Sequence, residues 1–459
     1  MRKTKRCIAQ FTFYDRTGIQ SFLEKQAEKG WLLEKMGTLN WKFRRITPGK
    51  IHYAVTYFPK ASVFDSEPSE QQKDFQEFCA HTGWKLAGAN AQLQIFYNEA
   101  ENPIPIETDA QMELETIHKS VKKSFIPSYL LLMLLALLQG GLFLGQLLDD
   151  PIGTLSANTN LFRGFCWVIL LLMCLTEIVG YICWYRKAKK AAEQDGSFVK
   201  TRGFRSIELA MLWAVLIALA LLLVSMKNSR LTILMLASIL WISLIYLLMF
   251  GALALMKRKK FSAATNRTLY IITCVIVSIV MIGILTFGAF RLADTGWFRR
   301  EPAETYTYKG RTWNVYQDEL PLTIEDLMTI DYEEYSYEWH AEESLVLAQF
   351  EAMQRPRMDA LEQLVLRYTI TEVRLSILYD WCKAELLKEF DITHTDEESF
   401  GAKELDAATW GADAAYQLWL GEPYPNYLIC YDNIIIEIQA DWELTPEQMT
   451  VIGEKLNGV

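Results

Sequence analysis

The chain has 459 residues, of which 51% are hydrophobic and 22% are charged, and its formal net charge is −9. The apolar residues are concentrated between positions 125 and 292, which excludes a wholly soluble globular protein. The eight cysteines include no CxxC pair, which excludes a zinc ribbon and a thioredoxin-like redox motif.

The two ends of the chain differ sharply in charge. From Asp294 onward, 12 Lys and Arg residues stand against 34 Asp and Glu residues, a net charge of −22 that leaves +13 for residues 1–293. Such an asymmetry predicts different surroundings for the two ends. The basic part suits the anionic inner leaflet of a membrane, and the acidic part indicates a solvated outer surface.

The N-terminus lacks the pattern of a secretory signal peptide. Its first basic residues are followed by a short stretch, Cys7 to Tyr14, in which Gln10 and Thr12 interrupt the apolar residues. A signal peptide needs a longer apolar core and a cleavage site flanked by small residues. We therefore expect residues 1–124 to form a domain that stays in the cytoplasm.

Residues 1–124 contain an internal repeat with a spacing of 53 residues. Phe, Glu, Ala, Gly, Trp and Leu recur at the same offsets in residues 22–33 and 75–86, and such a fixed period indicates a duplicated unit. Alternation and cap signals predict strand, helix, strand, strand in each copy. The predicted elements are 8–14, 17–29, 31–36 and 39–45 in the first copy, and 51–58, 69–82, 84–87 and 92–98 in the second.

Glycine and tryptophan mark the same point in both copies. Thr17 is the expected N-cap of the first helix, and Gly30 and Gly83 follow the two helices, where a left-handed cap favours glycine. Trp31 and Trp84 come next, and we interpret them as core residues between helix and sheet rather than as ligand-stacking residues. Two such βαββ units predict an α+β domain.

A set of motifs in this region resembles a known family. The motifs are Phe11-Thr12-Phe13-Tyr14-Asp15, Leu23-Glu24, Gly30-Trp31-Leu32-Leu33, Trp41-Lys42-Phe43, Tyr53-Ala54-Val55-Thr56-Tyr57-Phe58 and Gly83-Trp84. Over roughly residues 5–120 and the apolar block that follows, they are similar to the DUF2812 family of uncharacterised bacterial membrane proteins. The resemblance implies a bacterial cell-membrane protein with a genetic link to a PadR-like repressor, in a regulatory or stress setting. It implies no activity.

Residues 125–292 contain five apolar stretches, each long enough to cross a bilayer as a helix. They lie at about 126–148, 164–185, 207–226, 231–256 and 269–290. The middle of the chain is therefore expected to be an all-α bundle of five transmembrane helices.

The distribution of Lys and Arg between these stretches predicts the orientation. The segment after the second stretch carries seven of them and that after the fourth carries five, whereas residues 149–161 carry none and the turn after the third carries two. The alternation places the N-terminus in the cytoplasm and the C-terminus outside. Arg291, Arg299 and Arg300 follow the fifth stretch and argue against this orientation, because they place positive charge on the side predicted to be outside. They are fewer than the basic residues of the loop at the other end of that stretch.

Glu177 is the one acidic residue well inside a predicted span, about two turns from its cytoplasmic end. An ionisable group at this depth is costly and faces a cavity or a partner. One interpretation is a proton or ligand site. The other, which we favour because the spans offer no basic partner, is a protonated or hydrogen-bonded packing residue.

The first span carries the pattern of a helix–helix contact. Gln139 and Gln146 are seven residues apart and share one face, and Gly141 and Gly145 form a GxxxG motif. We interpret the four residues as helix-packing candidates.

Residues 293–459 predict an acidic α+β domain outside the membrane. Expected are a hairpin at 306–315, strands at 345–353 and 364–373, a helix at 374–390, a hairpin of 427–431 and 434–439, and a capping box at Thr445-Pro446-Glu447-Gln448. Cys382 and Cys430 would both lie outside and form a candidate disulfide.

No catalytic, metal or cofactor motif is present, because the five histidines are scattered and no phosphate-binding loop or nucleophile elbow occurs. Topology explains the basic loops, so no nucleic-acid partner is expected. We favour a non-enzymatic transmembrane sensor or adaptor, with the lipid bilayer and a cytoplasmic protein that binds residues 1–124 as partners. The alternatives are a transporter or transporter accessory that uses Glu177, and an envelope enzyme with its site in the outer domain.

Overall fold

The computed structural model describes residues 3–9, 11–37, 40–201, 203, 205–226, 229–297, 300–329, 335–360, 364–389 and 400–458. The chain divides into two compact units. The first unit comprises Met1–Gln139 and Cys166–Arg291, and the second comprises Gly140–Phe165 and Leu292–Val459. This division cuts through three of the long apolar helices, so it differs from the three consecutive domains that we expected, and the expected domains stay a proposal.

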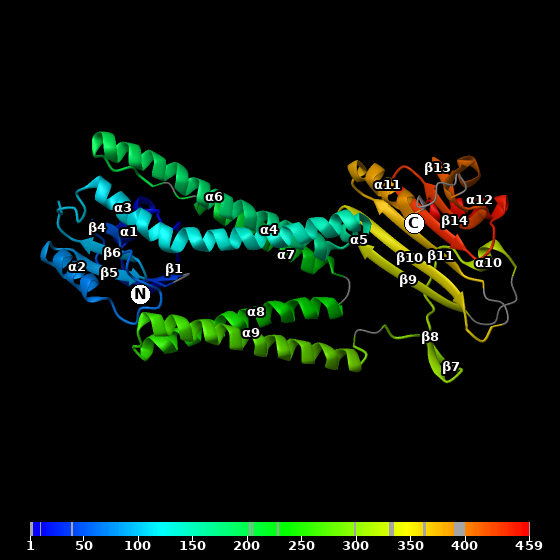
Figure 1. Ribbon diagram of the computed structural model, residues 1–459, viewed down its shortest axis with the longest axis horizontal. Coiled ribbons are helices and arrows are strands. Elements are labelled where there is room, and N and C mark those ends of the chain that lie inside the picture. The colour runs from blue at the N-terminus through cyan, green and yellow to red at the C-terminus, as the bar shows by residue number, and fades with distance from the viewer. Residues whose placement is uncertain are drawn as a thin grey trace. The chain divides into compact units, whose positions relative to one another are not determined.

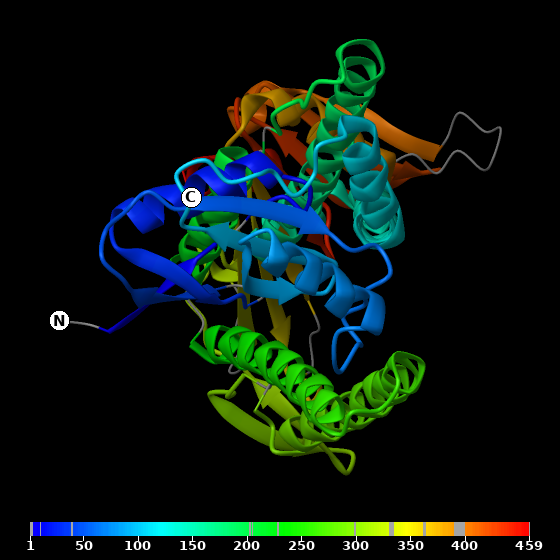
Figure 2. The same cartoon turned by 90° about the vertical axis from the view of Figure 1, so that its left-hand side faces the viewer.

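The first unit begins with two small α/β elements of the same design (Figure 2). In each, one antiparallel sheet places the third strand between the first and the second, in the orders β1-β3-β2 and β4-β6-β5. The first comprises β1 (Thr4–Ile8), α1 (Arg16–Glu28), β2 (Trp31–Lys35) and β3 (Asn40–Arg45). The second comprises β4 (His52–Tyr57), α2 (Glu70–His81), β5 (Lys85–Asn90) and β6 (Leu93–Asn98).

The helix boundaries follow from caps. Asp15 and Ser69 are the N-caps of α1 and α2, and each side chain accepts a hydrogen bond from a backbone N–H of the first turn. Gly30 and Gly83 follow the two helices with φ values of 77° and 86°, the left-handed region that disfavours other residues. The predicted N-cap Thr17 is therefore wrong, because Asp15 occupies that position.

The first strand is the main error in this region. It spans Thr4–Ile8 rather than 8–14, and residues 11–14 form a turn in which Asp15 N donates to Thr12 O at 2.9 Å. Alternation of apolar and polar residues does not distinguish a strand from a loop whose side chains are buried alternately.

The two tryptophans that we assigned to the core differ in burial. Trp84 is buried, and its indole Nε1 donates to Ile104 O at 2.8 Å. Trp31 is half-buried, and its ring lies between the cations of Lys5 and Arg45, 5.7 and 4.9 Å from the ring centre.

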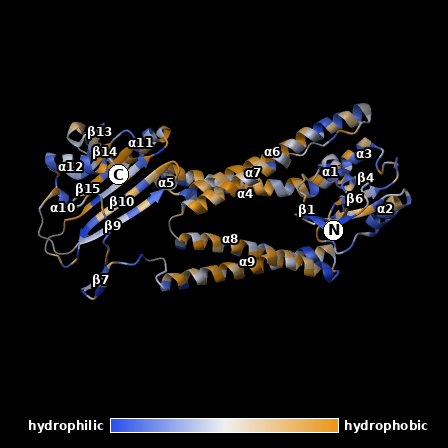
Figure 3. Ribbon diagram, turned by 180° about the vertical axis from the view of Figure 1, so that it is seen from behind, coloured by the Kyte–Doolittle hydropathy of each residue, from blue (hydrophilic) through white to orange (hydrophobic). Residues whose placement is uncertain are grey.

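Seven α-helices and one π-helical turn follow in the middle of the described chain. Five of them are long and apolar enough to cross a membrane, as expected, and they are the apolar ribbons of Figure 3. They are α4 (Ile126–Asp149), α6 (Asn158–Asp195), α7 (Arg205–Ser225), α8 (Ser229–Arg258) and α9 (Ala263–Asp294). Helix α3 (Ala110–Ser120) continues into α4 through a π-helical turn (Val121–Phe125). The short helix α5 (Pro151–Ser156) lies between α4 and α6 in the sequence.

The second unit is built on a seven-stranded antiparallel sheet of order β12-β13-β14-β15-β11-β10-β9 (Figure 1). A separate hairpin, β7 (Glu304–Tyr308) and β8 (Arg311–Val315), precedes it. The strands are β9 (Tyr335–Glu343), β10 (Leu347–Pro356), β11 (Leu366–Val373), β12 (Phe400–Leu405), β13 (Ala414–Leu420), β14 (Pro423–Cys430) and β15 (Ile434–Ala440). The helices are α10 (Ile324–Leu327), α11 (Tyr379–Glu389) and α12 (Pro446–Leu456).

This sheet buries apolar side chains on both faces. Successive residues of a strand point to opposite faces, and Ile436 of β15 joins a core with α10 and α12, whereas Ile435 joins a core with α5 and α11. The second of these cores places α5, which follows the first membrane helix in the sequence, against the C-terminal sheet.

The sequence located most of this region's elements. Both predicted hairpins, the strands β10 and β11 and the capping box of Thr445 are confirmed. The predicted helix at 374–390 begins later, at Tyr379, after a 3-10 turn (Ser376–Leu378). Strands β9, β12 and β13 were not predicted.

Gly30→Ala tests the left-handed cap. A Cβ there would lie 2.9 Å from Ile46 O on a backbone with φ of 77°, so we expect a loss of about 1–2 kcal/mol in unfolding free energy. Thermal unfolding of the full chain in detergent provides the measurement. Gly49→Ala is the control, since its Cβ would meet nothing closer than 3.9 Å. Equal effects of the two substitutions would contradict this account of the cap.

Candidate functional site

Residues 11–17, Phe-Thr-Phe-Tyr-Asp-Arg-Thr, connect β1 to α1, and we call them the docking segment. None of these seven side chains is exposed, although the segment lies outside regular structure up to Asp15. Its partners come from the π-helical turn before α4, from α6 and from the segment between α6 and α7. The docking segment therefore joins the N-terminal sheets to the ends of membrane helices within the first unit.

Asp15 performs two tasks at once. Its Oδ1 accepts from Gly18 N at 3.1 Å, which caps α1, and from Thr201 Oγ1 at 2.8 Å. An added Cβ at Gly18 or at Gly203 would lie within 2.4 Å of the same carboxylate, so both chain segments approach Asp15 closely. The start of α1 is thus fixed to the segment that follows α6.

Thr17 and Thr201 form a reciprocal pair. Thr17 N donates to Thr201 Oγ1 at 3.0 Å, and Thr201 N donates to Thr17 Oγ1 at 2.9 Å. Two backbone N–H groups are satisfied by two side chains that are 184 residues apart in the sequence.

Tyr14 inserts its fully buried ring among aromatic residues of the membrane helices. The ring centre lies 5.4 Å from Trp184, 5.2 Å from Tyr181 and 5.8 Å from Phe125, distances at which aromatic rings attract one another. Burial, with the neighbouring carboxyl groups of Glu177 and Asp15, raises the pKa of the Tyr14 phenol, which therefore stays a neutral hydroxyl.

Glu177 lies at the centre of this junction. Only 1% of it is exposed, and its Oε1 accepts a hydrogen bond from Thr12 Oγ1 at 3.1 Å. Glu208, in the first turn of α7, is also buried and is close enough to interact electrostatically with Glu177. The sequence offered no basic partner for Glu177, and the structure supplies a hydroxyl donor, Thr12.

A second contact between α3 and α6 reinforces the junction. The Nδ1 of His118 lies 2.6 Å from the Tyr181 hydroxyl, and its ring stacks on Tyr185 with centres 4.4 Å apart. This pair orients the same aromatic cluster that receives Tyr14.

Sequence analysis did not identify two residues of this junction, Thr12 and Glu208. Thr12 was assigned to a strand, so its hydroxyl was not considered as a donor. Glu208 lies in the first turn of α7. Acidic residues are common at helix N-termini, so its position did not indicate a special role.

The predicted helix-packing residues of α4 are not brought together by the described helices. Gln139 is exposed, and a Cβ added at Gly141 or Gly145 would meet nothing within 4 Å. Gln146 accepts from Arg163 Nη2 at 2.5 Å. The packing role of the four residues therefore stays a prediction.

The close approach between α4 and α6 occurs at a different glycine. A Cβ at Gly164 would lie 2.7 Å from the ring of Phe143, and Arg163 also stacks on that ring. Phe143 lies between Gly141 and Gly145 of the predicted motif, but Gly164 belongs to no GxxxG motif, so the sequence offered no sign that these two residues meet.

A carboxyl pair lies beside the docking segment. Arg16 forms an ion pair with the buried carboxylate of Glu113, and its guanidinium lies over Phe198. Burial and the neighbouring charge of Glu113 raise the pKa of the Glu107 carboxyl to about 8. Glu107 and Arg16 also line a pocket of about 360 Å³ beside β4.

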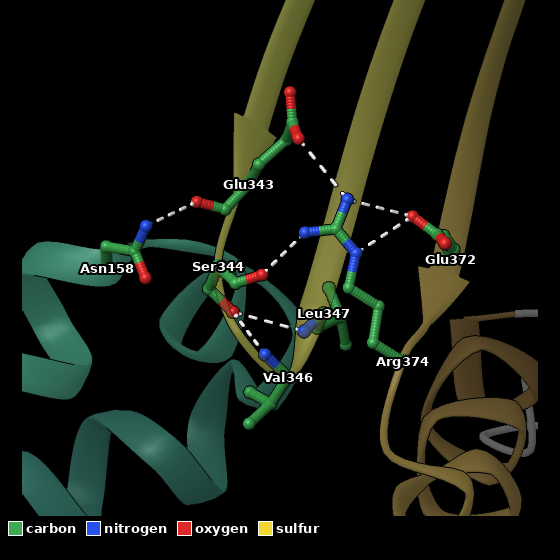
Figure 4. Close-up of polar contacts among 7 residues, drawn as sticks. All are labelled: Asn158, Glu343, Ser344, Val346, Leu347, Glu372 and Arg374. Atoms are coloured by element: carbon green, nitrogen blue, oxygen red, sulfur yellow. Dashed lines mark hydrogen bonds and ion pairs between the residues drawn. The ribbon is translucent and has the colours of Figure 1, made fainter. Parts of the chain in front are cut away.

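In the second unit, the first residue of α6 is hydrogen-bonded to the end of β9, next to the turn between β9 and β10 (Figure 4). Asn158 Nδ2 donates to Glu343 O at 3.0 Å, and Arg374 Nη1 donates to Ser344 O at 2.7 Å. Arg374 also forms ion pairs with Glu343 and Glu372. Together with the apolar residues of α5, these contacts attach the C-terminal sheet to the start of α6.

An open polar cleft of about 610 Å³ lies over four neighbouring strands of the same sheet. Its floor carries Glu437, Thr369, Glu351 and His340, which are paired across β15, β11, β10 and β9. Arg367 adds a positive charge beside them. The lining is mixed in charge, which is suited to binding a polar ligand.

Cys382 and Cys430 are free thiols buried in one apolar core. Burial raises the pKa of both, that of Cys382 to about 11, so both remain protonated and unreactive at neutral pH. Their pairing stays a prediction. In the part of the chain that the structure describes, no group of His, Cys, Asp and Glu side chains is arranged to hold a metal ion.

Five helices of the described chain are long and apolar enough to cross a membrane, which indicates a membrane-associated protein. The family model described as "Protein of unknown function (DUF2812)" matches residues 15–129, which run from the cap of α1 to the first turn of α4. Over these residues the chain is similar to that family, in agreement with the resemblance seen in the motifs. No curated protein and no solved structure matches the chain.

The raised pKa of Glu107 predicts a pH dependence of stability. Because the folded state holds this proton more tightly than the unfolded chain, the contribution of Glu107 is present below about pH 4.5 and is lost as the pH rises to about 8. Glu107→Gln should therefore raise the melting temperature at pH 8 but not at pH 5. The exposed Glu101→Gln is the control, and a gain at both pH values would contradict the assignment.

The Thr17–Thr201 pair predicts local protection of the docking segment. Thr17→Val should remove about 1 kcal/mol of hydrogen bonding and make amide exchange at residues 15–18 and 201 about fivefold faster. Hydrogen exchange of the full chain measures the effect, with the exposed Thr47→Val as the control. Unchanged exchange in Thr17→Val would show that the pair does not hold the segment.

Proposed function

We propose that this protein is a non-enzymatic transmembrane sensor or adaptor of the bacterial cell membrane. Residues 1–124 would form its cytoplasmic domain, residues 125–292 its membrane region and residues 293–459 its extracytoplasmic domain. The observation that carries the proposal is the docking segment, which ties the N-terminal sheets to Glu177 and to the segment after α6.

The route of transmission in this proposal is α6. Its first residue, Asn158, binds the β9–β10 turn of the C-terminal sheet, and nineteen residues later Glu177 accepts the hydrogen bond of Thr12. A helix without a break transmits an axial shift or a rotation between its ends, because its backbone hydrogen bonds form one continuous ladder. Ligand binding at the outer domain would thereby strengthen or weaken the contacts between α6 and the docking segment.

Contacts of the loops support the proposed orientation. Thr201, in the segment between α6 and α7, binds the docking segment, and the α8–α9 loop contacts the N-terminal region through the Lys260–Glu67 ion pair. Both loops are the basic ones. The positive-inside rule therefore assigns them and the N-terminal region to the cytoplasm.

The cytoplasmic output in this proposal is a protein partner. The two βαββ elements share one strand order, which favours an origin by duplication, and they offer sheet and helix surfaces for docking. A PadR-like repressor encoded nearby stays the expected genetic setting, with no nucleic-acid contact by this chain.

A transporter or transporter accessory is the second candidate, and the buried carboxyl groups of Glu177 and Glu208 favour it. The adaptor is preferred because Glu177 accepts a hydrogen bond from a soluble-domain residue, Thr12, which a transport site has no need of. An envelope enzyme would use the cleft of Glu351 and Glu437, and that cleft displays no nucleophile activated by an adjacent base.

Transmission through α6 is tested by perturbing α5. Leu155, buried against the C-terminal sheet, is changed to Ala, and hydrogen exchange is measured at residues 11–17 of the full chain in nanodiscs. We expect faster exchange there, whereas Leu345→Ala, at a side chain that is 79% exposed, should have no effect. Exchange that changes around α5 and not in the docking segment would refute the adaptor mechanism.

The orientation is tested with fusions at the C-terminus. Alkaline phosphatase, which is active only outside the cytoplasm, should be active there, and a fluorescent protein that folds only inside should stay dark. An inactive phosphatase with a fluorescent partner would reverse the topology.

A further inference from the structure

The second βαββ element contains a segment that corresponds to the docking segment of the first. The docking segment connects β1 to α1, and residues 64–69 lie between β4 and α2. Each contains the N-cap of the helix that follows, Asp15 in the first and Ser69 in the second. Phe64 follows Phe11 by 53 residues, the spacing of the repeat. Residues 64–69 are therefore the counterpart of the docking segment in sequence and in structure.

Asn266, in the first turn of α9, binds this counterpart to the turn between α8 and α9. Its side chain is fully buried, and its Nδ2 lies 2.9 Å from Phe64 O and 3.0 Å from Ser66 Oγ. The same Nδ2 lies 3.2 Å from Phe261 O, and Ser66 Oγ donates to that carbonyl at 3.0 Å. A buried amide is costly without hydrogen-bond partners, so Asn266 favours the position in which these acceptors surround it.

Two weaker contacts flank this hydrogen-bonded cluster. The ring of Phe64 lies 5.7 Å from that of Tyr270, one turn further along α9. Lys260, in the turn between α8 and α9, forms an ion pair of 2.6 Å with Glu67, and both side chains are more than half exposed. An exposed ion pair contributes little to stability, because water screens it. The buried amide of Asn266 is therefore the main anchor.

The turn is also where polar contacts can fix the position of the α8–α9 hairpin. Of the apolar stretches of α8 and α9, 0% and 6% are buried, so most of their side chains face outward. Apolar side chains in lipid gain no hydrophobic free energy by packing on other helices. The hydrogen bonds at the turn thus contribute strongly to the attachment of this hairpin to the N-terminal region.

The two segments bind different connections between the long apolar helices. The docking segment binds Thr201, between α6 and α7, and residues 64–69 bind the turn between α8 and α9. Among the hydrogen bonds and ion pairs described above, the two segments have no partner in common. Contacts that share no partner contribute independently to stability.

We propose that residues 64–69 are a second docking segment, which binds the α8–α9 turn through Asn266 and opens independently of the first docking segment. Each copy of the duplicated unit then holds one connection between membrane helices. The second segment opens at the lower cost in free energy, because most of its residues are partly or fully exposed and few contacts attach it. The inference rests on contacts within the first unit and does not depend on the adaptor function proposed above.

Asn266→Ala tests this second site by hydrogen exchange of the full chain in nanodiscs. The probes are the backbone N–H groups of Phe64 and Asp65, which donate to Ser62 within the segment. Loss of the Asn266 hydrogen bonds should make their exchange about fivefold faster or more, and exchange at residues 11–17 should stay unchanged. The control is Thr268→Ala, at an exposed side chain two residues further along α9, which should alter neither segment.

Ser66→Ala is the second variant, and it serves if Asn266→Ala does not fold. Ser66 is only partly buried, and its loss removes one acceptor of Asn266 and the donor to Phe261 O. Unchanged exchange at Phe64 and Asp65 in the folded variants would overturn the second docking site. Equal acceleration at residues 11–17 would show that both segments open together, and it would overturn their independence.

Discussion

The structure of the first unit depends on satisfying one carboxyl group in an apolar helix. Glu177 lies in α6 with 1% of its surface exposed, where an unpaired polar group would cost several kcal/mol. The partner comes from a soluble segment rather than from a neighbouring span, because Thr12 reaches the carboxylate from the docking segment. Around this bond, the Tyr14 ring, the Asp15 cap and the Thr17–Thr201 pair specify one docked position for the N-terminal sheets.

The second unit solves a parallel problem with apolar packing. Its sheet has two apolar faces, and α5 covers part of one of them with Ile152 and Leu155. The two kinds of contact respond differently to substitution. A buried polar contact is lost as a whole when one of its groups changes charge, whereas apolar packing weakens gradually as side-chain volume is removed. Polar contacts around Glu177 thus hold the docking segment, whereas apolar contacts with Ile152 and Leu155 hold α5 on the C-terminal sheet.

Sequence reasoning found what local patterns encode. The five spans, the two βαββ elements, the caps at Gly30 and Gly83 and the capping box of Thr445 follow from periodicity and from cap chemistry, which act over a few residues. It could not find Thr12, Glu208 or Gly164 as partners, because their contacts join segments up to 165 residues apart. The one misplaced strand, 8–14, coincides with the docking segment, where tertiary contacts override the local alternation.

The most direct test of the account is a double-mutant cycle between Thr12 and Glu177. Unfolding free energies of the full chain are compared for Thr12→Val, Glu177→Leu and the double variant. The account predicts a coupling energy of about 0.5–1.5 kcal/mol, the range for a hydrogen bond within a protein. Additive effects of the two substitutions would contradict it, because the docking segment would then be held without Glu177.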